Sequence, residues 1–377
     1  MKTTIYLSTL LFILLSCAVR AQDARPLYFE DAPNNMKRFF FDQNYFLVDK
    51  NCEFKYLERV SSFDKDTNKF AGTFKDFDPN GRLILTGQYQ DGKKQGEFKA
   101  FHPNGALKWE SNFTDDIPSG SWKYYYPDGK PMLFVTLAQD NFYINQYWNR
   151  QGEQLVKDGE GKYDIDLPII GFTDHGYTKF NRQGKVKNGQ PDGIWYISFV
   201  NEQKRQERTL LFIEQYENGV LNGKRFEEGF EHLMIAEEDF VFTPNDYFPR
   251  AEFMLSKKCS FDEFTGFNVF IANKFMHYLN EVGYIKGQDS EKEMEITYQV
   301  SVSKNGIPSG IQLKQSESFS KEEKFYLNQM LNQIGYYLPS FYQNDPIADI
   351  LSIKFIIQYQ DRKIHISPVQ IQREKGV

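Results

Sequence analysis

The sequence predicts a mainly β protein with an elongated antiparallel sheet of β-hairpin repeats, followed by a small α+β domain. Three observations support this fold class. The 35 Phe and 23 Tyr among 377 residues favour aromatic-rich strands over an all-helical protein. A turn signal recurs with a constant period in the N-terminal half of the chain. Beyond residue 260 or so, helical and strand-like spacings of apolar residues alternate, which is typical of an α+β unit.

The recurring turn signal is an aromatic residue, one further residue, and Pro-Asn-Gly or Pro-Asp-Gly. It begins at Phe77, Phe101 and Tyr125, so the starts lie 24 residues apart (77, 101 and 125). Proline presets the backbone of the turn, and glycine takes the left-handed conformation that closes a short hairpin loop. A constant period predicts one supersecondary element per repeat.

A second signal has the same phase, because Gly72, Gly96 and Gly120 each begin the strand that leads into the turn. Each unit is therefore expected to be a β-hairpin. Three clear units and three or four degenerate ones extend over residues 70–228. These residues resemble the bacterial MORN-variant repeat, which also occurs in YwqK-type proteins. The resemblance implies an elongated sheet that acts as a scaffold or binding surface, without catalytic residues.

Two columns of side chains alternate along the repeats. The aromatic column consists of Phe74, Phe98 and Trp122. The lysine column lies one position later and consists of Lys75, Lys99 and Lys123. Alternation directs the two columns to opposite faces, with successive lysines about 10 Å apart. The aromatic column is expected to be core, with a carbohydrate-stacking platform as the alternative. The lysine column is either a solvated face or the site of one extended anionic partner.

The α+β domain is predicted at residues 262–360, after a linker or boundary at residues 229–261. Apolar residues recur every four positions from Phe267 to Leu279, which predicts a helix. Between 294 and 302 they alternate with polar residues, which predicts a strand, and a Lys-Asn-Gly hairpin signal follows at 304–306.

A second helix and a last strand complete this domain. Ser320 and Glu323 have the spacing of a capping box that opens a helix. Residues 351–359 then alternate between apolar and polar side chains. Residues 361–377 are expected to be a tail.

This order of elements is similar to the C-terminal domain of TonB-family energy transducers. The family's Tyr-Pro is absent after the first helix, at residues 278–280, and its Trp-x-Pro appears only as Tyr-Leu-Pro at 337–339. No N-terminal membrane helix of full length or Pro-rich span accompanies the domain, so energy transduction is not expected. The resemblance implies that an exposed strand edge, at Phe355, Ile357 and Tyr359, accepts an extended peptide by β-augmentation. A covered edge is the alternative.

Residues 1–21 have the features of a secretory signal, with Lys2, an apolar run and small residues before a cut after Ala21. The segment that ends in Cys17 also resembles a lipobox, so a lipid anchor there is one alternative and an uncleaved anchor is another. No second apolar stretch reaches membrane length. The chain is therefore expected to be exported to the periplasm or beyond, or lipid-anchored at the outer envelope. Residues 22–69 are a short N-terminal region.

Cys52 and Cys259 remain after cleavage at Ala21, in a compartment that permits disulfides. Two cysteines do not make a disulfide scaffold, so two independent thiols are expected, with a long-range bridge as the alternative. Neither belongs to a Cys-x-x-Cys motif or lies among clustered histidines, which argues against a zinc site.

Chemical motifs are scarce, and no catalytic residue, metal site or cofactor is assigned. The five histidines are scattered along the chain. Asp174 and His175 could be a fragment of an active site, but a loop in a degenerate repeat is the simpler interpretation. The formal charge of -6 and the pI of about 5.6 argue against nucleic acid as a partner.

These features favour an exported scaffold or binding protein without enzymatic activity, whose partner is an envelope protein or an extended peptide. Glycan or cell-wall binding on the repeat face is the alternative. An enzyme with a dispersed site is a third hypothesis, since catalytic sets can be far apart in sequence.

Overall fold

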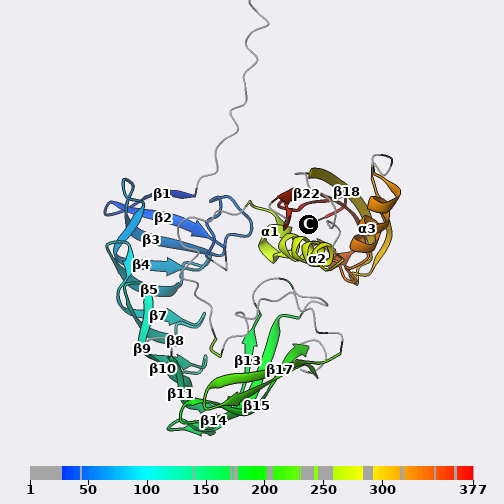
Figure 1. The fold of residues 1–377 in the computed structure, drawn as a ribbon. Helices are drawn as coiled ribbons and strands as arrows, with labels where there is room; N and C mark the ends of the chain where they lie inside the picture. The colour runs from blue at the N-terminus through cyan, green and yellow to red at the C-terminus, as the bar shows by residue number, and fades with distance from the viewer. Residues whose placement is uncertain are drawn as a thin grey trace, which may run out of the picture.

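The computed structural model describes residues 28–42, 45–138, 141–169, 172, 177–201, 207–228, 230, 242–244, 258–282, 292–314, 317, 319–343, 345–360 and 363–376. The secretory signal, Cys17, Asp174 and His175 lie outside these residues. Within them the expected fold class is confirmed: a long antiparallel sheet of hairpins precedes a small α+β region, and the chain is mostly strand with three helices (Figure 1).

The long sheet contains seventeen strands of the described residues. They are β1 (Phe29–Ala32), β2 (Met36–Phe41), β3 (Leu57–Asp64), β4 (Lys69–Phe77), β5 (Leu83–Gln90), β6 (Lys93–Lys94), β7 (Gly96–Phe101), β8 (Leu107–Thr114), β9 (Ile117–Tyr125), β10 (Pro131–Ala138), β11 (Asn141–Trp148), β12 (Gln154–Lys157), β13 (Glu160–Pro168), β14 (Lys179–Lys187), β15 (Gln190–Asn201), β16 (Glu207–Glu217) and β17 (Val220–Phe226).

Successive strands pair along the chain, so the sheet is a meander. The exception is the short β6, which pairs with β5, while β5 also pairs directly with β7. The hairpin turns form as expected. Gly81, Gly105 and Gly129 have φ of 76°, 84° and 83°. Their backbone N–H groups donate to the carbonyl oxygens three residues earlier, at 2.8 Å in each turn. Strands β1 to β3 belong to the same sheet, so the pairing begins well before residue 70.

The aromatic column lies on the buried face of this sheet. Phe74 and Phe98 are fully buried, and Trp122 is 8% exposed. Small residues opposite the rings make room for them: a Cβ added to Gly87 would lie 2.5 Å from the Phe98 ring. The column is therefore core, and it does not form the exposed platform that carbohydrate stacking would need.

A buried ion pair lies within the same core. Arg59 on β3 donates two hydrogen bonds to the carboxylate of Asp76 on β4, at 2.7 and 2.8 Å, and both side chains are fully buried. Its guanidinium carbon is 4.1 Å from the centre of the Phe74 ring. The pairing and the aromatic ring compensate the charge, which explains how arginine is accommodated inside the sheet.

The C-terminal domain is a second, smaller sheet with helices on one face. Its elements are α1 (Phe261–Thr265), α2 (Phe267–Glu281), β18 (Lys292–Val302), β19 (Pro308–Leu313), α3 (Lys321–Leu331), β20 (Ser340–Tyr342), β21 (Asp345–Ile347), β22 (Asp349–Gln360), β23 (Lys363–Ile366) and β24 (Gln370–Arg373). The expected capping box is present, because Ser320 and Glu323 exchange side chain to backbone hydrogen bonds.

The strand order of this sheet is β19, β18, β22, with β23 and β24 both paired to β22, whereas β20 and β21 form a separate two-stranded sheet. The residues expected to form a tail therefore contribute two strands. Arg373 in β24 also forms an ion pair with Asp262 of α1. The alternation in these strands spans only four residues each, which is too short for periodicity to distinguish them from a tail.

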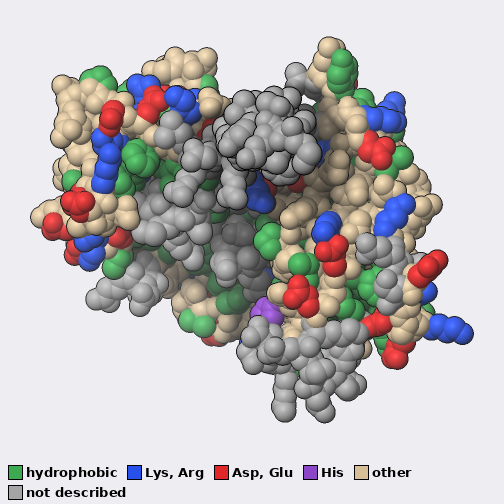
Figure 2. Space-filling view, turned by 90° about the horizontal axis from the view of Figure 1, so that it is seen from above, with side chains coloured by type: hydrophobic (Ala, Val, Ile, Leu, Met, Phe, Trp, Pro, Cys, Tyr) green, Lys and Arg blue, Asp and Glu red, His purple; other side chains and the backbone are tan. Residues whose placement is uncertain are grey.

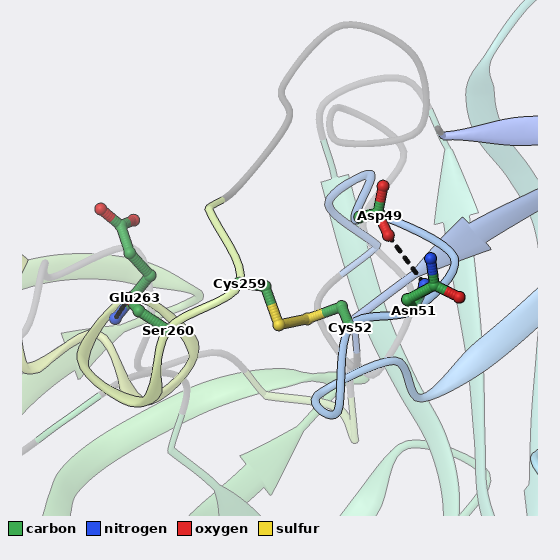
Figure 3. The surroundings of a disulfide bond; sticks show 6 residues. All are labelled: Asp49, Asn51, Cys52, Cys259, Ser260 and Glu263. Atoms are coloured by element: carbon green, nitrogen blue, oxygen red, sulfur yellow. Dashed lines mark hydrogen bonds between the residues drawn. A yellow bond between two sulfur atoms is a disulfide. The ribbon is translucent and has the colours of Figure 1, made fainter. Parts of the chain in front are cut away.

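The expectation of two independent thiols is wrong, because Cys52 and Cys259 form a disulfide across 207 residues (Figure 3). Cys52 lies in the loop between β2 and β3, and Cys259 directly precedes α1. The ring of Phe54 stacks on that of Phe264 with 5.0 Å between centres. The bridge therefore joins the N-terminal end of the long sheet to the C-terminal domain.

A second contact joins the C-terminal domain to the later hairpins. Phe172, between β13 and β14, lies against the rings of Phe267 and Phe270, with 4.9 Å between centres in each case. It also stacks on Tyr336. In Figure 1 the long sheet curves, and the C-terminal domain lies beside its N-terminal end and above β13 to β17. None of the described helices has the length and apolar character needed to cross a membrane.

Candidate partner-binding surface

The outward face of the repeats carries one row of side chains that runs across six strands. Strand register places Lys75, Thr86, Lys99, Glu110, Lys123 and Phe134 opposite one another in that order. Because paired residues of antiparallel strands point to the same face, these side chains form a continuous row. We call it the outer row. It lies on the face opposite the buried aromatic column.

The outer row has mixed charge. Lys75 is exposed, and no ion pair of its Nζ is described. Lys99 Nζ donates to Glu97 at 2.8 Å, and Lys123 Nζ donates to Glu110 at 3.1 Å. The pKa of Lys99 is raised by this hydrogen bond and by the negative charges of Glu97 and Glu110. The row is therefore a lysine-rich surface interrupted by carboxylates. On the face seen in Figure 2, side chains of both signs are likewise interspersed.

A second aromatic column, which the sequence analysis did not assign to a surface, lies beside the outer row. It consists of Phe77, Phe101 and Tyr125, the first residues of the three turn signals. All three are half-buried, and none belongs to the described core cluster of the sheet. The signal was present in the sequence: these residues lie three positions after Phe74, Phe98 and Trp122, and alternation directs such positions to the opposite face.

Two further aromatics extend this surface at its C-terminal side. The ring centre of Phe134 on β10 is 5.9 Å from that of Tyr125 and 5.0 Å from that of Trp148 on β11. Both pairs meet edge to face, with 66° between ring planes. Lys123 Nζ lies 6.0 Å above the Phe134 ring. We call Phe77, Phe101, Tyr125, Phe134 and Trp148 the outer aromatics.

Tyr125 is held in place within this group. Its hydroxyl donates to Glu110 Oε1 at 3.1 Å. Partial burial, together with the hydrogen bond and the negative charge of Glu110, raises the pKa of Tyr125 to about 12. The phenol therefore stays protonated at neutral pH.

Contacts between successive turns fix the spacing of the units. Arg82 donates to the carbonyl oxygen of Pro103 at 3.0 Å, and Asn104 donates to that of Pro127 at 2.7 Å. Each bond joins one turn to the next, about 24 residues further along. Phe77, Phe101 and Tyr125 are therefore the last residues of strands whose following turns are tied to one another.

One segment of this surface matches a known family. Residues 118–133 match the family model of the MORN repeat variant. The match covers most of β9, the turn that follows it and the start of β10, and it includes Lys123 and Tyr125 of the surface described above. A search of curated proteins finds no match to the chain. The match supports the MORN-repeat resemblance; the YwqK and TonB resemblances stay predictions.

The strand edge expected in the C-terminal domain is not available, which corrects the assignment of Phe355, Ile357 and Tyr359 to a partner surface. Phe355 and Ile357 are 1% and 2% exposed, and Tyr359 is half-buried. Strand β22 pairs with β18 along one side and with β23 and β24 along the other. Both edges of β22 are therefore occupied by the chain itself, since residues 363–373 fold back onto it.

Groups that could support metal or acid–base chemistry are not gathered in this part of the molecule. The described residues contain no cluster of three or more His, Cys, Asp or Glu side chains arranged to hold a metal ion. Two of the three lysines of the outer row form surface ion pairs, Lys99 with Glu97 of the same strand and Lys123 with Glu110 of the neighbouring strand. Such a surface suits binding of a partner by contact and charge.

Proposed function

We propose that this chain is an exported scaffold or binding protein without enzymatic activity, and that its outer row engages a protein of the cell envelope. The observation that carries the proposal is the continuity of the outer row across β4, β5, β7, β8, β9 and β10. The opposite face is closed by aromatic core, so the outer row is the face of these repeats that a partner can reach.

The family match supports a binding role. MORN repeats are commonly protein- or lipid-binding modules, and proteins that contain them are generally non-enzymatic. Export is supported by a separate observation. The Cys52–Cys259 disulfide is of a kind that persists in oxidising compartments and is rare in the cytosol.

The test is a pull-down from the envelope fraction of the native cell, with the full mature chain as bait. A variant with Lys75, Lys99 and Lys123 changed to Gln is compared with the wild type. The matched control changes Lys321, Lys354 and Lys363 of the C-terminal domain to Gln. We expect the first variant to lose a specific protein that the control retains. Equal capture by both variants would place recognition elsewhere and overturn the proposal.

A further inference from the structure

We propose that the outer aromatics and the outer row together bind an acidic, proline-rich peptide in the polyproline II conformation. The peptide would run across the strands, with prolines on the aromatics and carboxylates near the lysines. This inference rests on the proposed function and names the chemistry of its partner. The observation behind it is that two columns of side chains run side by side with the same 24-residue period. One column consists of Phe77, Phe101 and Tyr125, and the other of Lys75, Lys99 and Lys123.

The period of the surface matches the period of such a peptide. Each unit contributes two strands, so equivalent side chains of successive units lie about 9.6 Å apart. A polyproline II helix advances about 9.3 Å in three residues, which is one full turn. Every third residue of the peptide therefore meets an equivalent position of the next unit. Sheet twist of about 20–25° per strand limits the match to two or three units, that is, to a peptide of about nine residues.

The shape of the aromatic surface also fits proline. The Phe134 ring meets the rings of Tyr125 and Trp148 edge to face, so neighbouring rings of this surface are steeply inclined to one another. Grooves lined by aromatic side chains recognise proline-rich segments because these segments are already extended and lose little entropy on binding. A sugar ring stacks on one flat face instead, and the edge-to-face arrangement offers no coplanar platform for a row of sugars.

The lysine column supplies the charge preference. Lys75 is exposed, while Lys99 and Lys123 form ion pairs at the surface with Glu97 and Glu110. Exposed ion pairs contribute little free energy. A carboxylate of the peptide can therefore replace Glu97 or Glu110 as the partner of a lysine with little loss of free energy. Binding is therefore expected to weaken as salt rises, because the lysines are in contact with solvent.

The experiment measures binding of fluorescent nine-residue peptides to the full mature chain by anisotropy. The probe is three repeats of Pro-Glu-Pro. Three repeats of Gly-Glu-Gly carry the same charge without the stiff conformation, and three repeats of Pro-Lys-Pro carry the opposite charge. We expect the first probe to bind at least about tenfold more tightly than either control. Equal binding of the glycine peptide would show that charge alone accounts for the affinity, and it would overturn the inference.

Matched variants locate the site. Phe101→Thr removes one outer aromatic and keeps a strand-forming residue, and it is expected to weaken the first probe about tenfold. Phe325→Thr makes the same change on α3, where Phe325 is 59% exposed, and is expected to leave binding unchanged. Lys75→Glu is expected to weaken binding about threefold and to flatten its salt dependence, whereas Lys363→Glu is not. Equal losses for Phe101→Thr and Phe325→Thr would contradict the assigned site.

Three further outcomes separate this inference from the proposed function. If a chito-oligosaccharide binds in a Phe101-dependent manner and the peptide does not, the surface is a glycan site and the peptide inference is wrong. If the envelope pull-down depends on the lysine column but no proline peptide binds, the proposed function stands and only the ligand chemistry falls. If neither assay depends on the outer surface, both are overturned.

Discussion

At the scale of single residues, the core of the repeats depends on small side chains placed under aromatic rings. Gly87 pairs with Phe74 across β4 and β5, and the Phe98 ring of the following unit covers it. Ser111 takes the same place opposite Phe98 in the next unit. The close approach of ring and backbone at Gly87 explains why glycine occupies this strand position in spite of its poor strand propensity.

Gly87→Ala is expected to lower the free energy of unfolding by about 1–3 kcal/mol, because the new methyl group would overlap the Phe98 ring. Urea denaturation followed by tryptophan fluorescence measures the change. Gly223→Ala is the matched control: it lies in β17, has no heavy atom within 4 Å of its added Cβ, and has no positive φ to strain. A destabilisation of the same size at both positions would argue against the ring contact.

Asp76→Ala is expected to destabilise the protein by about 3–5 kcal/mol, since it leaves the buried guanidinium of Arg59 without its carboxylate. Glu97→Ala removes the partner of Lys99 at the surface and is expected to cost less than about 1 kcal/mol. Thermal unfolding of the two variants gives the comparison. Similar losses in both would contradict a special contribution of the buried Arg59–Asp76 pair to stability.

Tyr125 is expected to ionise near pH 12, whereas an ordinary tyrosine ionises near pH 10. Because the pKa is raised in the folded state, the unfolded chain loses this proton at a lower pH than the folded chain. The contribution of Tyr125 to the free energy of unfolding is therefore complete below pH 10 and is lost as the pH rises to 12. The measurement is a pH titration followed by the absorbance of tyrosinate. The difference between the wild type and Tyr125→Phe isolates the ionisation of Tyr125. Glu110→Gln should move the ionisation of Tyr125 toward pH 10; an unchanged titration would leave partial burial as the cause of the raised pKa.

At the scale of elements, strand pairing decides which edges are open to a partner. The alternating residues of β22 predicted a strand that would be the last of the domain; the structure contains the strand, but β23 and β24 follow it. The strands that pair with its second edge could not be predicted from the sequence, because β23 and β24 are only four residues long. Their register with β22 also depends on the chain folding back onto that strand. The covered edge follows from this long-range pairing.

Deletion of residues 361–377 is expected to destabilise the C-terminal domain by several kcal/mol, of the order of a lost buried ion pair. The deletion removes β23, β24 and the bond from Arg373 to Asp262, whose side chains are 5% and 10% exposed. Lys363→Ala, at an exposed position of the same segment, serves as the control. Hydrogen exchange at β22 reports the effect directly, and unchanged protection there would mean that the segment is a dispensable tail.

At the scale of the whole molecule, a disulfide and aromatic contacts at Phe54 and Phe172 hold the C-terminal domain to two distant parts of the sheet. The disulfide ties it to the loop after β2, and Phe172 inserts between α2 and Tyr336. The sheet by itself is a meander with two ends. These contacts make the N-terminal hairpins, the later hairpins and the C-terminal domain parts of one assembly.

The Cys52–Cys259 bridge is expected to appear as a complete absence of free thiols in the denatured mature chain, and as two thiols after reduction. Maleimide labelling followed by mass measurement counts them. The double variant Cys52→Ser, Cys259→Ser is expected to be about 4–5 kcal/mol less stable, because a loop of this length restricts the unfolded chain strongly. Two labelled thiols before reduction would contradict the bridge.

The sequence by itself determined the local architecture of this protein. The 24-residue period, the Pro-Asn-Gly turns and the strand alternation predicted the hairpins, the buried column at Phe74, Phe98 and Trp122, and the opposite placement of the lysines. These features depend on interactions between residues near in sequence, and turn chemistry and alternation record such interactions directly. The same alternation places Phe77, Phe101 and Tyr125 on the outer face.

Only the tertiary structure decided the disulfide, the occupied edges of β22 and the docking of Phe172. Each joins residues that are far apart in the chain or depends on how whole elements pack. No periodicity encodes such contacts, because the free energy of packing depends on shape complementarity between surfaces that form only after the hairpins and helices exist.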